Sequence, residues 1–411
     1  MTTTPSQRLT QLPPYLFAVI NKLKLDAYAR NLDVIDLGMG NPDLPTDPVI
    51  VERLAETVRE HPRTHRYPQA KGMPKFRAAV AEWFAKRFGV KFDPDSEVLA
   101  LVGSKEGVAH LCMAFLDAGD HTLIPEPAYP VYYNTTVLAG GVPHLLPITE
   151  ANGYLPDLGS VPADVLQRTK ILFLNYPNNP TAAVVSDDAF LKDAIRFARK
   201  HDLVLCYDNA YSELTFDGYV APSIFQYEGA RDVAVEFHSF SKTFSMAGWR
   251  LGFVVGNPRI VGVLEKFKSF VDYGSPSFVQ LAGVKALAEH ERIAREVAGT
   301  YRTRRDLLVR ELARIGWQVT VPRATMYLWA KLPERITREV GSLKFTETLL
   351  RDTGVVLSPG VGFGPSGEGY VRISLVTANN RFHDAALRID KVFKQFGVRL
   401  RDGGVTVPPA P

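Results

Sequence analysis

Short apolar runs constrain the fold of this chain more than any other feature. They occupy residues 171–174, 203–207, 233–237 and 251–255, and helical patterns lie between them. A strand that is apolar along its whole length is buried on both faces, as in parallel sheets covered by helices. The pattern therefore predicts an α/β fold with a mostly parallel sheet.

The length of 411 residues exceeds what one ordinary hydrophobic core serves. We expect an N-terminal arm at 1–45 that contributes to the small domain and the active site. A large ligand-binding domain follows at 46–285, and a smaller α+β domain at 286–411. The smaller domain should begin within a long helical region at 278–315. Its expected strands are 317–321, 327–332, 355–357 and 370–375, and its expected helices are 344–351 and 381–396.

Composition narrows the class of protein. Hydrophobic residues make up 46% and charged residues 22%, which is average for a globular enzyme. A net charge of +4 gives no reason to expect nucleic-acid or membrane partners. No signal peptide or run of ~18 apolar residues is visible, so a cytoplasmic location is expected. The nine histidines show no metal-ligand spacing, and no metal site is predicted.

Polar residues stand where three of the apolar runs end. Asn175, Asp208 and Ser239 each follow a predicted strand. In open parallel sheets, ligands bind beyond the carboxyl ends of the strands. The three positions therefore indicate one crevice.

Lys242 follows the third of these ends, within the run Ser-Phe-Ser-Lys-Thr-Phe-Ser-Met-Ala-Gly-Trp-Arg. A deprotonated lysine amine is a good nucleophile for an aldehyde, although most lysines are surface charges. Ser239, Ser241 and Arg250 suit a phosphate, since the planar guanidinium can bind it through two hydrogen bonds. Ser104 and Lys105 open a helix after a strand at 98–102, where free backbone amides also attract phosphate.

Asp208 and Tyr211 add a third chemical group. A carboxylate at a buried strand end can pair with a pyridinium nitrogen, the alternatives being a helix cap or a structural salt bridge. Tyr211 could reach a phenolic oxygen, or be an ordinary buried tyrosine. Pyridoxal phosphate presents an aldehyde, a phosphate and a pyridine nitrogen together, so the set predicts a site for that cofactor.

Further residues suit a substrate or the cofactor ring. Arg372 lies inside an apolar strand, where a buried cation needs an anion; the alternative is an inter-strand ion pair. Asn179 lies in a turn just past a strand. Tyr129 could stack on the cofactor ring, or simply occupy a proline-rich loop.

From about residue 13 to 396, the chain resembles fold-type I, class I pyridoxal-phosphate aminotransferases, and the run around Lys242 carries the resemblance. The resemblance implies a homodimeric transferase of amino-acid metabolism with shared active sites. Lys242 would bind the cofactor covalently and shuttle protons, Asp208 would face the ring nitrogen, and Tyr211 the phenolic oxygen. The other implied contacts are Tyr129 with the ring, Ser104, Lys105, Ser239 and Arg250 with phosphate, Tyr67 with the partner subunit's phosphate, and Gly40, Asn179 and Arg372 with the substrate α-carboxylate.

Two departures bear on specificity. Ala182 replaces the glycine that usually follows Asn-Pro-Thr, and residues 272–277 contain no arginine for a distal carboxylate. Finer motifs resemble bacterial glutamate–pyruvate (alanine) and LL-diaminopimelate aminotransferases. We therefore predict amino transfer between alanine or glutamate and pyruvate or 2-oxoglutarate, with LL-diaminopimelate as the alternative donor. Tyr15, Tyr129 and the loop near Tyr273 should line the side-chain pocket. A lyase cleaving a Cβ–sulfur bond and a non-catalytic binding protein are less favoured, since fold and cofactor do not fix the reaction.

Overall fold

A seven-stranded mixed sheet forms the centre of the larger part of the protein. The computed structural model describes residues 3–13 and 16–400. The strand order is β2-β8-β7-β6-β5-β3-β4; β3 to β7 run parallel, and β8 is antiparallel to β2 and β7. The mostly parallel α/β fold is confirmed. The strands are β2 (Val98–Leu101), β3 (His121–Glu126), β4 (Val142–Pro147), β5 (Thr169–Asn175), β6 (Val204–Asp208), β7 (Ala234–Ser239) and β8 (Gly252–Gly256).

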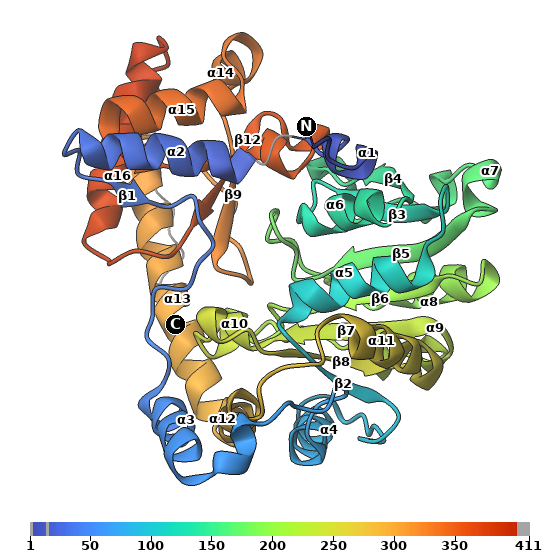
Figure 1. Ribbon diagram of the computed structural model, residues 1–411. Coiled ribbons are helices and arrows are strands. Elements are labelled where there is room, and N and C mark those ends of the chain that lie inside the picture. The colour runs from blue at the N-terminus through green and yellow to red at the C-terminus, as the bar shows by residue number, and fades with distance from the viewer. Residues whose placement is uncertain (1–2, 14–15, 401–411) are drawn as a thin grey trace.

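Helices cover both faces of this sheet, as continuous apolar strands require (Figure 1). One face packs on α5 (Ser104–Phe115), α6 (Val131–Leu138) and α11 (Pro258–Val271). The other packs on α4 (Pro74–Phe88), α8 (Ala189–Lys200) and α12 (Ser277–Ala288). One edge of the sheet, where α10 follows β7, faces the smaller part of the protein (Figure 1).

The smaller part contains two short sheets. Strands β11 (Ser358–Pro359), β12 (Tyr370–Ser374) and β9 (Tyr327–Lys331) form one in the order β11-β12-β9, and β1 (Ile35–Asp36) pairs with β10 (Val355–Val356) in the other. Helices α2 (Leu16–Ala29), α15 (Ser342–Thr353) and α16 (Arg381–Gln395) surround them (Figure 1). The long helix α13 (His290–Arg314) joins the two parts, and the N-terminal segment runs beside it from β1 to α3 (Pro48–Glu60) (Figure 1). The remaining helices are α1 (Gln7–Thr10), α7 (Ala163–Leu166), α9 (Ala230–Val233), α10 (Phe240–Thr243) and α14 (Glu334–Glu339), with 3₁₀ turns at Pro62–His65, Glu150–Asn152, Leu158–Ser160, Ile224–Gln226, Ala247–Trp249, Gly360–Phe363 and Pro365–Gly367.

Two predicted elements differ from the structure. The helical region at 278–315 is two helices, because the backbone of Glu289 leaves helical geometry at φ −100°, ψ 10° between α12 and α13. Residues 317–321 form no strand. Trp317 is buried instead by its side chain, whose Nε1 donates to the carbonyl of Lys331 at 2.8 Å. Val321, by contrast, is 48% exposed, so the apolar alternation at 317–321 does not form one buried strand face. The domain boundaries at 45 and 285 remain predictions.

Candidate active site

A cavity of about 770 Å³ lies between the carboxyl ends of β5, β6 and β7 and the smaller part of the protein. Segments from across the chain meet there, from the N-terminal arm to β12. Most of the predicted site residues line it: Gly40, Ser104, Lys105, Tyr129, Asn179, Asp208, Tyr211, Ser239, Ser241, Lys242, Arg250 and Arg372.

Tyr67, and Tyr273 in the loop expected to line the side-chain pocket, are not among the described residues that line the cavity. Tyr67 is 91% exposed, and its ring packs edge-on against that of Tyr273 at a centroid distance of 6.1 Å. A single chain therefore does not bring Tyr67 to the site. Tyr15 lies outside the described residues.

Lys242 extends from α10, directly after β7, into the cavity. Its Nζ donates to the backbone carbonyl of Gly40 at 2.7 Å. Burial lowers the pKa of Lys242, because a charged amine is poorly solvated there. The environment thus favours the neutral, nucleophilic amine that attack on an aldehyde requires.

Asp208 ends β6 and is buried. Its Oδ1 accepts a 3.3 Å hydrogen bond from the backbone N–H of Ala210, and its Oδ2 accepts a 2.7 Å bond from the hydroxyl of Tyr132. Burial raises the pKa of Asp208, and the Tyr132 hydrogen bond acts in the opposite direction. A cation beside Asp208, such as a protonated pyridine nitrogen, would complete the pairing that a buried carboxylate needs.

Tyr132 was not predicted as a site residue. It lies three residues after Tyr129, on α6, and its ring stacks on Phe173 at 4.9 Å. Tyr129 precedes α6, and its ring lies 6.0 Å from that of Tyr132. Nothing in the sequence indicated that the hydroxyl would reach a strand end 76 residues away.

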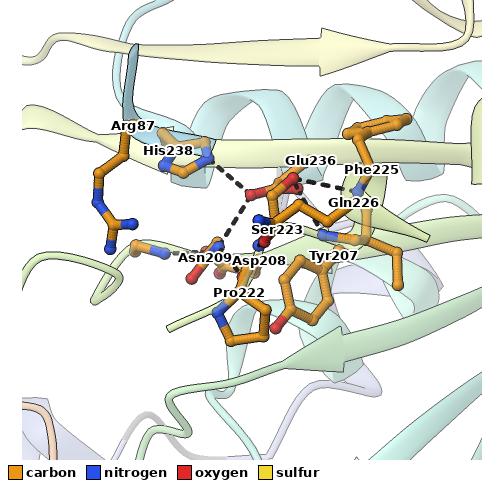
Figure 2. Close-up of polar contacts among 12 residues, drawn as sticks. Arg87, Tyr207, Asp208, Asn209, Pro222, Ser223, Phe225, Gln226, Glu236 and His238 are labelled. Carbon is orange, nitrogen blue, oxygen red and sulfur yellow. Dashed lines mark hydrogen bonds and ion pairs between the residues drawn. The ribbon is translucent and has the colours of Figure 1, made fainter. Parts of the chain in front are cut away.

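A second buried carboxylate fixes the segment next to Asp208 (Figure 2). Glu236 Oε1 accepts from Asn209 Nδ2 at 2.8 Å and lies 2.8 Å from His238 Nε2, while its Oε2 accepts from Ser223 Oγ at 2.6 Å. All three partners are buried. Because Asn209 follows Asp208 directly, this network restricts the backbone on which Asp208 sits (Figure 2).

The phosphate end that the sequence predicts lies at the first turn of α5, where backbone amides are free of intrahelical partners. The Arg250 guanidinium packs against Gly103: a Cβ there would lie 2.5 Å from Arg250 Nη2. Gly103 also has φ +83°, so glycine is required on both counts. Ser239 and Ser241 line the same cavity. These donors fit a phosphate dianion.

Arg372, on β12, is buried and lines the same cavity. Its Nη1 donates to Asn179 Oδ1 at 2.8 Å, and its Nη2 donates to the carbonyl of Gly38 at 3.0 Å. The rings of Tyr327 and Phe363 lie 4.2 and 4.6 Å from its guanidinium carbon. These contacts hold the planar fork in one orientation, as bidentate carboxylate binding requires.

Tyr211 and Tyr327 join their hydroxyls across a 3.0 Å hydrogen bond. Burial raises the pKa of Tyr211 well above its ordinary value, so its hydroxyl stays protonated and can donate. Tyr327 was predicted only as part of a strand. Its proximity to Tyr211 depends on where the smaller part places β9 relative to the turn after β6, which no local pattern reveals.

Comparison with known proteins identifies the family. The model of the family "Aminotransferase class I and II" matches residues 32–386. The chain belongs to this family. Two curated relatives are LL-diaminopimelate aminotransferases: that of Desulforudis audaxviator is 47% identical, covering 95% of this chain and 98% of the relative, and that of Moorella thermoacetica is 45% identical, covering 94% and 98%.

Solved structures agree with this assignment. Substrate-bound BacF of Bacillus subtilis has a TM-score of 0.90 and 36% identity, covering 95% of this chain and 98% of that one. A probable N-succinyldiaminopimelate aminotransferase of Thermus thermophilus has a TM-score of 0.85 and 39% identity, covering 92% and 99%.

The protein is therefore a pyridoxal-phosphate-dependent aminotransferase, as the sequence predicted. The names of the relatives match the alternative donor, LL-diaminopimelate, better than the leading prediction of alanine and glutamate. Within the described residues, no helix is both long and apolar enough to cross a bilayer.

Proposed function

We propose that this aminotransferase transfers an amino group from LL-diaminopimelate to a 2-oxo acid such as 2-oxoglutarate. The observation that carries the proposal is the group of curated LL-diaminopimelate aminotransferases, 44–48% identical over 93–95% of this chain. Alanine and glutamate, our leading sequence-based donors, lack a comparable observation.

The lining of the cavity supports a donor with two amino-acid ends. LL-diaminopimelate carries an ammonium and a carboxylate at its distal end as well as at the reacting end. Besides the residues already described, Asn21, Lys24 and Asp36 line the cavity. Lys24 and Asp36 form an ion pair at 2.9 Å, with side chains 20% and 26% exposed. The Lys24 ammonium could therefore meet the distal carboxylate of the donor, and the Asp36 carboxylate could meet its distal ammonium.

The roles of the site residues follow from their positions. Bound pyridoxal phosphate supplies an electron sink that stabilises negative charge at the substrate Cα. Arg372 would grip the α-carboxylate through two parallel hydrogen bonds and so orient the Cα–H bond toward Lys242. The neutral amine of Lys242 would then move the proton between the substrate Cα and C4′ of the cofactor. Asp208 would hold the ring nitrogen protonated, and Tyr129 would pack on the ring face.

We also propose that the protein forms a homodimer in which each active site draws on both chains, and that it acts in the cytoplasm. Tyr67 and Tyr273 form an exposed aromatic pair away from their own cavity, which suits a contact with a second copy. Mixing inactive Tyr67 and Lys242 variants tests this idea, because a hybrid dimer can contain one site with both native residues. Failure to recover any activity after confirmed subunit exchange would contradict it.

The donor is tested by competition. The purified enzyme receives equal concentrations of LL-diaminopimelate and alanine with 2-oxoglutarate, and consumption of each donor is followed. We expect LL-diaminopimelate to be consumed first. Preference for alanine would support alanine as the amino donor and would leave the transaminase assignment unchanged. Release of pyruvate from a cysteine conjugate without a 2-oxo acid would instead indicate a lyase.

A further inference from the structure

Tyr327 connects the two halves of the active site. Its hydroxyl lies 3.0 Å from that of Tyr211, on the cofactor side, while its ring lies 4.2 Å from the guanidinium carbon of Arg372, on the substrate side. The side chain is buried at 2% exposure. It also fills the space beside Gly40: a Cβ added at Gly40 would collide with the Tyr327 hydroxyl. Gly40 in turn accepts the hydrogen bond of Lys242.

The charges around Tyr327 come from several elements. Lys242 on α10 and Arg372 on β12 are the basic groups beside it. The hydrogen bond from Tyr211 also lowers the pKa of Tyr327, and Tyr327 in turn raises the pKa of Tyr301. Burial alone would raise the pKa of Tyr327, but Lys242 and Arg372 outweigh it and lower the pKa. Tyr327 is therefore the more acidic phenol of the hydrogen-bonded pair, since the pKa of Tyr211 is raised.

A neutral Tyr327 hydroxyl can donate to the oxygen of Tyr211 across their 3.0 Å contact. Tyr211 has only one proton, and it becomes available for the phenolic oxygen of the cofactor.

We propose that Tyr327 is a positioning residue that orients the Tyr211 hydroxyl toward the cofactor through its own hydroxyl and holds Arg372 through its ring. It acts through Tyr211 and Arg372 and needs no contact with the reacting atoms. The inference depends on pyridoxal-phosphate binding at Lys242, and it is independent of which amino acid is the donor.

The first test reads the hydroxyl role from the colour of the holoenzyme. Donation from Tyr211 would stabilise negative charge on the cofactor's phenolic oxygen, and that oxygen would need this donor most once the Lys242 nitrogen joined to the cofactor has lost its proton. Weaker donation therefore shifts the pH midpoint of the visible absorption change upward. Tyr327→Phe keeps the ring and removes the hydroxyl, and we expect a shift of roughly half a pH unit.

A control separates this effect from general loss of a buried hydroxyl. Tyr219 is buried and its hydroxyl donates to the carbonyl of Val185 at 3.2 Å, away from the cavity lining. Tyr219→Phe should leave the midpoint unchanged. A Tyr327→Phe enzyme with the wild-type midpoint, or one whose shift Tyr219→Phe reproduces, overturns the hydroxyl role.

Double variants test whether Tyr327 acts through Tyr211. Tyr211→Phe should itself raise the midpoint, by more than Tyr327→Phe does. Adding Tyr327→Phe to Tyr211→Phe should cause no further shift, because the intermediary is already absent. Additive shifts would mean that Tyr327 influences the cofactor by another route and would overturn the proposed link.

The ring role is read from binding of a non-reactive dicarboxylate, succinate, to the holoenzyme. Tyr327→Phe should keep the wild-type dissociation constant within about twofold, because its ring still supports Arg372. Tyr327→Leu removes the ring and should weaken succinate binding about tenfold. Equal succinate affinity for Leu and Phe variants that both retain cofactor absorbance and folded far-ultraviolet circular dichroism would overturn the ring role.

Discussion

The two sides of the active-site cavity are built in different ways. The side proposed to bind the cofactor, called the cofactor side, draws on strand ends of one sheet: Asp208 closes β6, and Ser239 closes β7 just before Lys242. The side proposed to bind the substrate carboxylate, called the carboxylate side, joins segments far apart in the chain: Arg372 bonds Asn179 across 193 residues and Gly38 across 334. Local motifs can therefore define the first side, whereas the second side exists only once the smaller part packs against the sheet.

The largest expected effect is on the cofactor side. Lys242→Ala removes the nucleophile and proton carrier together, so turnover should fall at least about a thousandfold. Borohydride reduction of the wild-type holoenzyme, followed by peptide mapping, should place the adduct on Lys242. The exposed, ion-paired Lys192 offers a control, and Lys192→Ala should keep full activity. An adduct on another lysine would contradict the assignment of Lys242 as the lysine that binds the cofactor.

On the carboxylate side, Arg372→Lys keeps the charge but loses the two-hydrogen-bond geometry. We expect the KM for the amino donor to rise about a hundredfold, while the cofactor absorbance stays that of the wild type. Unchanged kinetics, or loss of folding, would indicate that Arg372 is a structural element of the Asn179–Gly38 contact and does not bind substrate.

Asp36→Asn tests how the substrate side binds the distal end of the amino donor. The amide keeps an oxygen for the backbone N–H groups of Gly38 and Met39, which donate to Asp36 Oδ1 at 3.0 and 3.2 Å. The variant lacks the anion that we expect to meet the distal ammonium. KM for LL-diaminopimelate should rise about tenfold, and KM for alanine should stay the same. Equal changes for both donors would show that Asp36 supports the loop only.

The buried amine of Lys242 should also make the cofactor-free protein sensitive to pH. Burial lowers the pKa of Lys242 in the folded state, so between this value and about 10.4 the unfolded chain binds a proton that the folded chain has released. Stability of the wild type should therefore rise with pH across this window relative to Lys242→Met, whose side chain does not titrate. Urea unfolding of both proteins at several pH values measures the difference. A constant difference would mean that Lys242 is not desolvated.

The smallest effect concerns the loop that supplies Asn179. Ala182 has φ +57°, in the left-handed region that costs a side chain with a Cβ roughly 1 kcal/mol. Ala182→Gly relieves this strain but increases the freedom of the unfolded chain, so a net gain of about 0.5 kcal/mol is expected in urea unfolding. A loss of stability would show that packing of the buried Ala182 methyl outweighs the backbone strain.

The sequence predicted most of the residues that line the cavity around Lys242, because they follow buried strands. Asn175, Asp208 and Ser239 could be aligned at one sheet edge from the apolar runs alone, and Lys242 followed from its neighbours. Tyr132 and Tyr327 escaped prediction because their roles depend on a single hydroxyl reaching a distant residue, Asp208 or Tyr211. A buried tyrosine in an apolar segment looks the same whether or not its hydroxyl meets a functional group.

The amino-acid sequence by itself determined the mostly parallel sheet, the pyridoxal-phosphate cofactor and the family, since burial periodicity and local motifs are written along the chain. Only the tertiary structure decided how Arg372 is oriented, that Tyr327 stands between it and Tyr211, and that Tyr67 lies apart from its own cavity. The physical reason is that these relations depend on the packing of the two parts of the protein. Distances between side chains far apart in sequence are set by that packing and by no local preference of the residues involved.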